Sequence, residues 1–333
     1  MISGPRNLIT DVPGLLVGNA QDTALKSGAT VLLGPDQLTG SYCAMGGAPG
    51  TRETDLLEPD KSVAKIDAIT LSGGSTYGLD AASGVVSGLR EQGRGFPLLH
   101  LRIPLVPSAI VFDLLNGGDK DWRENPYPAL GRAALENARA DFELGSAGAG
   151  TGALTGMLKG GLGSASLVLE SGATVGALIV ANPVGNVTTP GERHFWAAPF
   201  EVDDEFGGLG PDPRSGLGRC FESRKAGAFA QLAHTAIGIV ATDISLTKAQ
   251  AKRIATVAHD GIARAIVPSH MPNDGDLIFA VSTDSREMRS PESDMRDIGH
   301  AAALCIARAV ARAVFHARPA PGDLLPCWSD GDS

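Results

Sequence analysis

The sequence predicts a mixed α/β fold, because short apolar runs of strand length alternate with amphipathic stretches of helical period. Glycine accounts for 43 of the 333 residues without a regular repeat, which indicates many tight turns and close backbone approaches. Aromatic residues make up only 5% of the chain, so alanine, valine, leucine and isoleucine must supply most of the core. Together these features favour sheets covered by helices.

Short apolar runs bounded by turn residues are predicted to be the strands. They span residues 29–33, 66–71, 98–103, 165–169, 174–181, 237–241 and 277–282. Stretches with apolar residues at helical spacing, 77–91, 128–138, 247–266 and 293–316, are predicted to be helices. Pro128 suits a first helical position and Thr247 is a good N-cap, whereas Pro268 and Pro319 follow the ends of two helices.

The stretch 182–234 interrupts this alternation, since it is rich in glycine, proline and charge. A connection of this length within one domain is usually either functional or disordered. It ends abruptly at an apolar strand that begins with Thr235. The tail after Gly322 is acidic, and we expect it to be mobile.

Composition excludes several classes of function. A net charge of −9 argues against a nucleic-acid partner, because neutralising phosphates requires a basic surface. The sequence has no uninterrupted apolar run of ~18 residues, so we expect no membrane span. The first residues do not resemble a secretory signal. The cysteines form no CxxC pair, so we expect reduced thiols and a cytoplasmic protein.

The common catalytic motifs HExxH, GxxxxGK[ST] and GxSxG do not occur. The histidines are scattered; we expect them to be solvated or capping residues, such as His259 and His270, with no metal and no cofactor. The glycine-rich stretch 148–152 fits neither nucleotide fingerprint, so close backbone packing is the favoured interpretation over a phosphate loop.

Three local patterns each allow a structural and a functional interpretation. Asp274 and Asp276 flank a glycine before a strand, which is typical of a turn but also places two carboxylates on one loop. Lys159 is a lone charge in a small, glycine-rich context, either on the surface or aimed at a reacting oxygen. Asn182 either ends a strand or supplies an amide donor.

Longer segments carry a resemblance. In order, they are GGAPGTRETDLL (46–57), LSGGSTYGLDAASGV (71–85), NPYPALGRAAL (125–135), GSAGAGTGALTGMLKGGLG (145–163), ANPVG (181–185), TAIGIVATDISLTKAQAKRIA (235–255) and NDGDLIFAVSTD (273–284). Together they strongly resemble the P1 family of self-processing aminopeptidases, the DmpA-type or S58 peptidases. That family includes β-peptidyl aminopeptidases and 6-aminohexanoate-oligomer hydrolases, and the resemblance covers roughly residues 7–317.

The resemblance implies one domain over residues 1–333, a four-layer α/β/β/α sandwich shared with ornithine acetyltransferases. It also implies self-cleavage between His234 and Thr235 into fragments 1–234 and 235–333, with Thr235 as the N-terminal nucleophile. The branch with a threonine nucleophile typically has Asn-Thr at this point, whereas this chain has His-Thr.

The same resemblance places Lys159, Asn182, Asp274 and Asp276 around the nucleophile. Phe112 stands where that branch has a tyrosine, so a hydroxyl is lost there. Phe112 and Tyr77 are the residues that we expect to bind the substrate.

The chemistry of these residue types agrees with that placement. A threonine hydroxyl needs a base to accept its proton, and a freed α-amine, with a pKa of ~7.7–8.0, is such a base near neutral pH. We expect Lys159 to favour the neutral amine of Thr235, and Asp274 and Asp276 to orient Lys159 or the amine. Asn182 would donate to the tetrahedral oxyanion.

We therefore expect an amidohydrolase that forms homo-oligomers. The resemblance implies that these are tetramers. It would cleave short peptides or amides of α-, β-, D- or ω-amino acids through an acyl-enzyme on Thr235. Two alternatives remain at this point: an acyltransferase of the ornithine acetyltransferase type, and an unprocessed relative without enzymatic activity.

Overall fold

The computed structural model describes residues 1–219, 222–225 and 234–332. Its strands are β1 (Ile2–Ser3), β2 (Leu16–Asp22), β3 (Ser27–Ala44), β4 (Thr51–Arg52), β5 (Lys65–Ser72), β6 (Phe96–Leu98), β7 (Leu101–Ile103), β8 (Ser108–Ile110), β9 (Gly161–Val168), β10 (Thr174–Asn182), β11 (Thr235–Ile244) and β12 (Leu277–Arg286). Its principal helices are α1 (Ala81–Glu91), α2 (Tyr127–Glu136), α4 (Lys248–Ala265) and α5 (Pro291–Phe315).

Strand β3 belongs to two layers of sheet. Its end, from Thr39 to Ala44, pairs antiparallel with β12, whereas its beginning pairs with β2 and β5. The register with β5 shifts between Leu33 and Leu38, where the strand passes from one layer to the other. The strand order β1-β9-β10-β11-β12-β3-β5-β8-β4 is therefore one continuous path through two stacked sheets.

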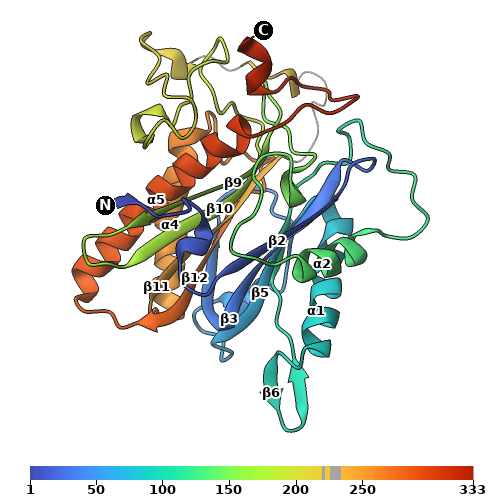
Figure 1. The fold of residues 1–333 in the computed structure, drawn as a ribbon, viewed down its shortest axis with the longest axis vertical. Coiled ribbons are helices and arrows are strands. Elements are labelled where there is room, and N and C mark those ends of the chain that lie inside the picture. The colour runs from blue at the N-terminus through green and yellow to red at the C-terminus, as the bar shows by residue number, and fades with distance from the viewer. Residues whose placement is uncertain (220–221, 226–233, 333) are drawn as a thin grey trace.

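Helices cover both outer faces of the stacked sheets (Figure 1). The alternation of side chains along β10 shows how the layers form. Ala177 and Ile179 face the core beneath α4 and α5, whereas Leu178 and Val180 face the core between the two sheets. A third core lies between α1, α2 and the β2-β3-β5 layer. The order of layers is thus α/β/β/α, which confirms the predicted fold.

Glycines let α5 lie unusually close to the sheet. A Cβ atom on Gly163 would lie 1.8 Å from the carbonyl oxygen of Ala309, and one on Gly161 would lie 2.4 Å from that of Ala313. In the described part of the chain, α5 alone has the length and apolar composition needed to cross a membrane, and 83% of its apolar window is buried. A core helix in a packed protein passes the same test.

Two local predictions are wrong. Residues 98–103 form parts of an antiparallel hairpin, β6 and β7, because the chain reverses at Leu99, which has a φ of 54°. The apolar run resembles a buried strand, yet Leu99 is 92% exposed. The acidic tail also packs onto the protein: Trp328 is buried and stacks on Phe195 with ring centroids 5.5 Å apart.

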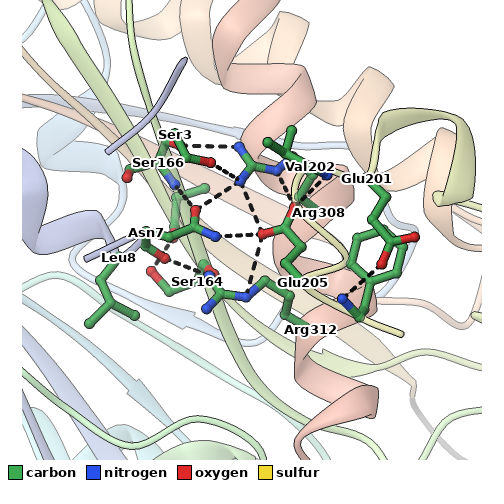
Figure 2. Close-up of polar contacts among 12 residues, drawn as sticks. Ser3, Asn7, Leu8, Ser164, Ser166, Glu201, Val202, Glu205, Arg308 and Arg312 are labelled. Atoms are coloured by element: carbon green, nitrogen blue, oxygen red, sulfur yellow. Dashed lines mark hydrogen bonds and ion pairs between the residues drawn. The ribbon is translucent and has the colours of Figure 1, made fainter. Parts of the chain in front are cut away.

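A buried ion cluster ties the long segment after β10 to α5 and to the N-terminal segment (Figure 2). Arg308 contacts both carboxylate oxygens of Glu205, at 2.5 and 3.0 Å. Arg312 adds a second guanidinium at 3.6 Å, and the amide of Asn7 donates to Glu205 and accepts from Arg308. One carboxylate therefore compensates two arginines that are almost wholly removed from water.

We expect Glu205→Gln to lower the free energy of unfolding by about 3–5 kcal/mol, because it leaves buried guanidinium charges without their partner. Chemical denaturation with a circular-dichroism readout measures this. The control is Glu136→Gln, which breaks an exposed pair with Arg132 and should cost less than about 1 kcal/mol. Equal, small effects of the two substitutions would contradict the structural importance of the cluster.

Candidate active site

Four of the predicted site residues, Asn182, Thr235, Asp274 and Asp276, meet where three neighbouring strands begin or end. Asn182 is the last residue of β10, Thr235 is the first residue of β11, and the two are partners in the antiparallel register. Asp274 lies in the loop that enters β12 and forms a parallel bridge with His234. Because β11 pairs with both neighbours, segments far apart in sequence converge on the peptide bond between His234 and Thr235.

The carbonyl group of that peptide bond receives two hydrogen bonds. The Thr235 hydroxyl donates to the His234 carbonyl oxygen at 2.6 Å, and the backbone N–H of Gly275 donates to the same oxygen at 2.6 Å. Both His234 and Thr235 are buried. The Thr235 hydroxyl therefore lies beside a carbonyl group whose oxygen is already held by a backbone donor, as in an oxyanion hole.

Gly275 is required at this point by space. A Cβ atom on it would lie 2.8 Å from the Thr235 hydroxyl oxygen and 2.7 Å from the carbonyl oxygen of Ala48. The loop is therefore a tight turn, as its sequence indicates, and it also contacts the nucleophile. The two interpretations of the Asp-Gly-Asp pattern are compatible.

Asp276 is held in place by three N–H groups. The backbone of Ala236, the residue after Thr235, donates to one carboxylate oxygen at 2.8 Å. The backbone N–H and the Nδ1 atom of His270 contact the other oxygen at 3.0 and 2.8 Å. The ring of His270 in turn packs edge-on against that of His259, with centroids 4.9 Å apart. Asp276 thus fixes the backbone of β11 directly after Thr235.

These two histidines correct the expectation that they are solvated or capping residues. His259 is buried, its Nε2 atom lies 2.9 Å from the Cys43 carbonyl oxygen, and burial lowers its pKa to about 4. His259 is therefore neutral at physiological pH. Within the described ranges, no cluster of three or more His, Cys, Asp or Glu side chains has the geometry to hold a metal ion.

Asp274 is fully buried and accepts a hydrogen bond from the Met271 N–H at 2.9 Å. Burial, and next the negative charge of Asp276, raise the pKa of Asp274 to about 6. This carboxyl group therefore changes charge close to neutral pH, within the range where a catalytic acid or base is useful.

The side-chain amide of Asn182 is oriented by the backbone. Its Oδ1 atom accepts from the Leu154 N–H at 3.0 Å, and its Nδ2 atom donates to the Phe112 carbonyl oxygen at 3.1 Å. The amide therefore has a defined orientation beside Thr235. Phe112 is connected to the site through its carbonyl group, whereas the prediction concerned its ring.

Two lysines occupy positions that the sequence does not predict. The Lys159 ammonium donates to the Asp323 carboxylate at 2.6 Å and to the Arg318 carbonyl oxygen at 2.9 Å, so it binds the C-terminal segment rather than Thr235. The ammonium that contacts Asn182 is that of Lys225, at 3.0 Å from Oδ1. The predicted role of Lys159 at the nucleophile has no contact to support it in the uncut chain.

The charge of Lys225 affects the pKa of His234. Burial lowers the pKa of Lys225 to about 7, although the negative charges of Asp274 and Asp113 act in the opposite direction. Burial, and next the charge of Lys225, lower the pKa of His234 to about 3, so His234 is neutral. The titratable groups beside the bond between His234 and Thr235 are therefore Asp274 and Lys225.

Tyr77 lies apart from this set. It precedes α1, is 48% exposed, and packs edge-on against Trp122 with centroids 5.9 Å apart. Its part in substrate binding stays a prediction.

Sequence reasoning missed Lys225, the two histidines and the backbone donor of Gly275. His270 lies two residues after Pro268, beyond the end of a predicted helix. The only sequence feature that points to a role at the site is its closeness to the Asp-Gly-Asp pattern. Lys225 lies ten positions before the proposed nucleophile, directly after Arg224 and before a run of small and apolar residues, and no periodic pattern marks it.

The fold is that of a hydrolase acting on amide bonds, and comparisons with known proteins agree. The family model of peptidase family S58 matches residues 7–324, so the chain belongs to that family. An uncharacterized aminopeptidase of Mycobacterium tuberculosis is 42% identical, over 97% of both chains. A 6-aminohexanoate-oligomer endohydrolase of a Kocuria species is 30% identical, over 88% of this chain and 80% of that protein.

Solved structures show the same fold. A β-aminopeptidase of a Burkholderia species superposes with a TM-score of 0.72 at 20% identity, over 99% of this chain and 94% of the other. The L-aminopeptidase D-Ala-esterase/amidase of Ochrobactrum anthropi, described as a variant of the Ntn-hydrolase fold, superposes with a TM-score of 0.71 at 24% identity, over 99% and 93%. The protein is accordingly a hydrolase that acts on amide bonds.

The raised pKa of Asp274 predicts how stability depends on pH. Its folded pKa of about 6 exceeds the unfolded value of ~3.9, so this group favours folding below pH ~4, and the contribution is lost as pH rises through 6. Asp274→Asn stays neutral throughout. The difference in free energy of unfolding between Asp274→Asn and its parent should therefore change with pH. We expect it to favour Asp274→Asn by ~2–3 kcal/mol more at pH 8 than at pH 4.

This comparison is best made in a Thr235→Ala background by urea denaturation, since the chain should then stay uncut. Asp36→Asn is the matched control, because Asp36 is exposed and its replacement should show no such pH dependence. A difference between Asp274→Asn and its parent that is the same at both pH values would refute the assignment.

Proposed function

We propose that the protein is a self-processing N-terminal-nucleophile amidohydrolase and that Thr235 is its nucleophile. The observation that carries this proposal is the pair of hydrogen bonds on the His234 carbonyl oxygen, one from the Thr235 hydroxyl and one from the Gly275 N–H. The first places the attacking oxygen beside the carbonyl carbon. The second stabilises the charge that develops on the carbonyl oxygen during attack.

Self-cleavage then proceeds as an N→O acyl shift. The Thr235 oxygen forms a bond to the His234 carbonyl carbon, the bond to the Thr235 nitrogen breaks, and the hydroxyl proton ends on that nitrogen. Water hydrolyses the resulting ester, which leaves a carboxylate on His234 and a free amine and hydroxyl on Thr235. The Gly275 N–H holds the oxyanion in the first step, a kind of interaction worth about 3 kcal/mol in comparable sites.

In each later turnover, the freed α-amine of Thr235 takes the hydroxyl proton as the hydroxyl attacks the substrate carbonyl. With a pKa of ~7.7–8.0, this amine is a competent base near neutral pH. The amide of Asn182 lies across the strand pair and would donate to the oxyanion, while Asp274 and Asp276 orient the amine. The proposal gives no step to Lys159, whose charge Asp323 neutralises.

The proposed substrates are short peptides or amides of amino acids that carry a free amino group, among α-, β-, D- and ω-amino acids. The names of the relatives support this class, since they include aminopeptidases and 6-aminohexanoate-oligomer endohydrolases. A homo-oligomer and a cytoplasmic location are further parts of the proposal. The exposed apolar side chains of the β6–β7 hairpin, including Leu99, support the first of these.

The test is hydrolysis of 6-aminohexanoyl- and β-alanyl-p-nitroanilide by variants of Thr235. We expect Thr235→Ala to lose at least ~10³-fold in kcat/KM, because the nucleophile is absent, and Thr235→Ser to retain part of the activity. Rapid quenching followed by mass spectrometry should show the acyl group on the fragment that begins at Thr235. Normal hydrolysis by Thr235→Ala would mean that another residue is the nucleophile.

A further inference from the structure

Four oxygen atoms surround the ammonium of Lys225. Its Nζ atom donates to the carbonyl oxygens of Leu154 at 2.5 Å, Asn182 at 2.8 Å and Pro183 at 3.3 Å, and to the side-chain Oδ1 of Asn182 at 3.0 Å. We call these four atoms the oxygen cradle. The residues that supply them are buried, and so is Lys225. The cradle therefore surrounds a primary amino group that bulk water does not reach, and burial lowers the pKa of this group to about 7.

The cradle has the chemistry of a primary-ammonium site. An R–NH3+ group has three N–H donors, and the cradle offers acceptors only, so its complement is a donor-rich cation. Asp274 and Asp113 add negative charge, since both favour the charged form of Lys225. Asp113 is itself buried and accepts hydrogen bonds from the Ser27 hydroxyl and the Gly74 N–H, which fix its position, while burial raises its pKa.

The cradle also lies in the proposed active site. Asn182 supplies two of the four oxygens and is the register partner of Thr235. The charge of Lys225 acts on both His234 and Asp274, which form the parallel bridge at the scissile bond. An ammonium in the cradle is therefore close to the bond that would be cut.

The cradle and its occupant come from different kinds of segment. The oxygens belong to the end of β10 and to the loop at Leu154, which are parts of the packed frame. Lys225 comes from the segment that precedes the proposed cleavage point, and it is not part of the sheet. Lys225 is thus a ligand that the uncut chain supplies to its own site.

We propose that the oxygen cradle is the subsite that binds the free primary ammonium of the substrate, and that Lys225 occupies it as an internal competitor. This inference rests on the proposed function. It names the substrate class as acyl groups that end in a primary ammonium on a flexible methylene arm, such as the lysine side chain itself. Substrates without this ammonium gain nothing from the cradle.

The test compares 6-aminohexanoyl-p-nitroanilide with hexanoyl-p-nitroanilide, which lacks only the amine. In the unaltered protein we expect the amine substrate to have the higher kcat/KM. In Lys225→Met, which keeps an unbranched side chain without donors, we expect the KM of the amine substrate to fall about tenfold, because a competitor no longer reduces the fraction of open sites. The ratio of the two kcat/KM values, that of the amine substrate over that of hexanoyl-p-nitroanilide, should therefore rise about tenfold.

Lys248→Met is the matched control. Lys248 is also buried, and its ammonium donates to three backbone carbonyl oxygens, those of Leu56, Lys61 and Val63, outside the site. Its replacement should leave both KM values unchanged. If Lys225 were instead a catalytic or structural group, Lys225→Met would lower kcat for both substrates or leave the protein misfolded, and the amine preference would not depend on the cradle.

Inhibition of the unaltered protein tests the subsite even if Lys225→Met fails to fold. We expect n-butylammonium to compete with the amine substrate, and 1-butanol and butyltrimethylammonium, which offer one donor or none, to inhibit at least ~10-fold more weakly. Equal inhibition by all three, or equal kcat/KM for the two anilides, would overturn the inference while hydrolysis through Thr235 still stood. Absence of any hydrolysis would instead refute the proposed function.

Discussion

The pairing of β11 with β10 on one side and β12 on the other is the constraint on which the site depends. Asn182 and Thr235 share a rung of the antiparallel pair, and the loop entering β12 brings Gly275 onto the preceding carbonyl group. A slip of one residue would turn every side chain of β11 to the opposite core. Side chains of this strand fill both cores, with Ile237 and Ile239 on one side and Val240 on the other, so packing fixes the position of Thr235.

Burial has opposite consequences for the two kinds of charge at the site. It raises the pKa of Asp274 to about 6 and lowers that of Lys225 to about 7, so both groups lie near neutrality where a proton moves at small cost. Three N–H groups hold the carboxylate of Asp276 in a fixed position. The two groups with shifted pKa values lie beside the bond between His234 and Thr235, an arrangement suited to amide chemistry near neutral pH.

The fold class and most elements could be predicted because each depends on a local period. It could not be predicted that β3 belongs to both sheet layers, since the period of apolar residues does not determine which strands pair. The resemblance of motifs placed Thr235, Asn182 and the Asp-Gly-Asp loop, and the structure does bring them together. Lys159 instead contacts Asp323 because the C-terminal tail folds back, and Lys225 reaches Asn182 across 43 positions of sequence; neither contact has a local signal.

The most direct measurement of the central claim is the covalent state of the purified, unaltered protein, read by intact-mass spectrometry and N-terminal sequencing. The account predicts two chains, one ending at His234 and one whose first residue is Thr235, while Thr235→Ala remains a single chain. A protein that hydrolyses amides at full rate as one uncut chain, or that is cut at another bond, would contradict it.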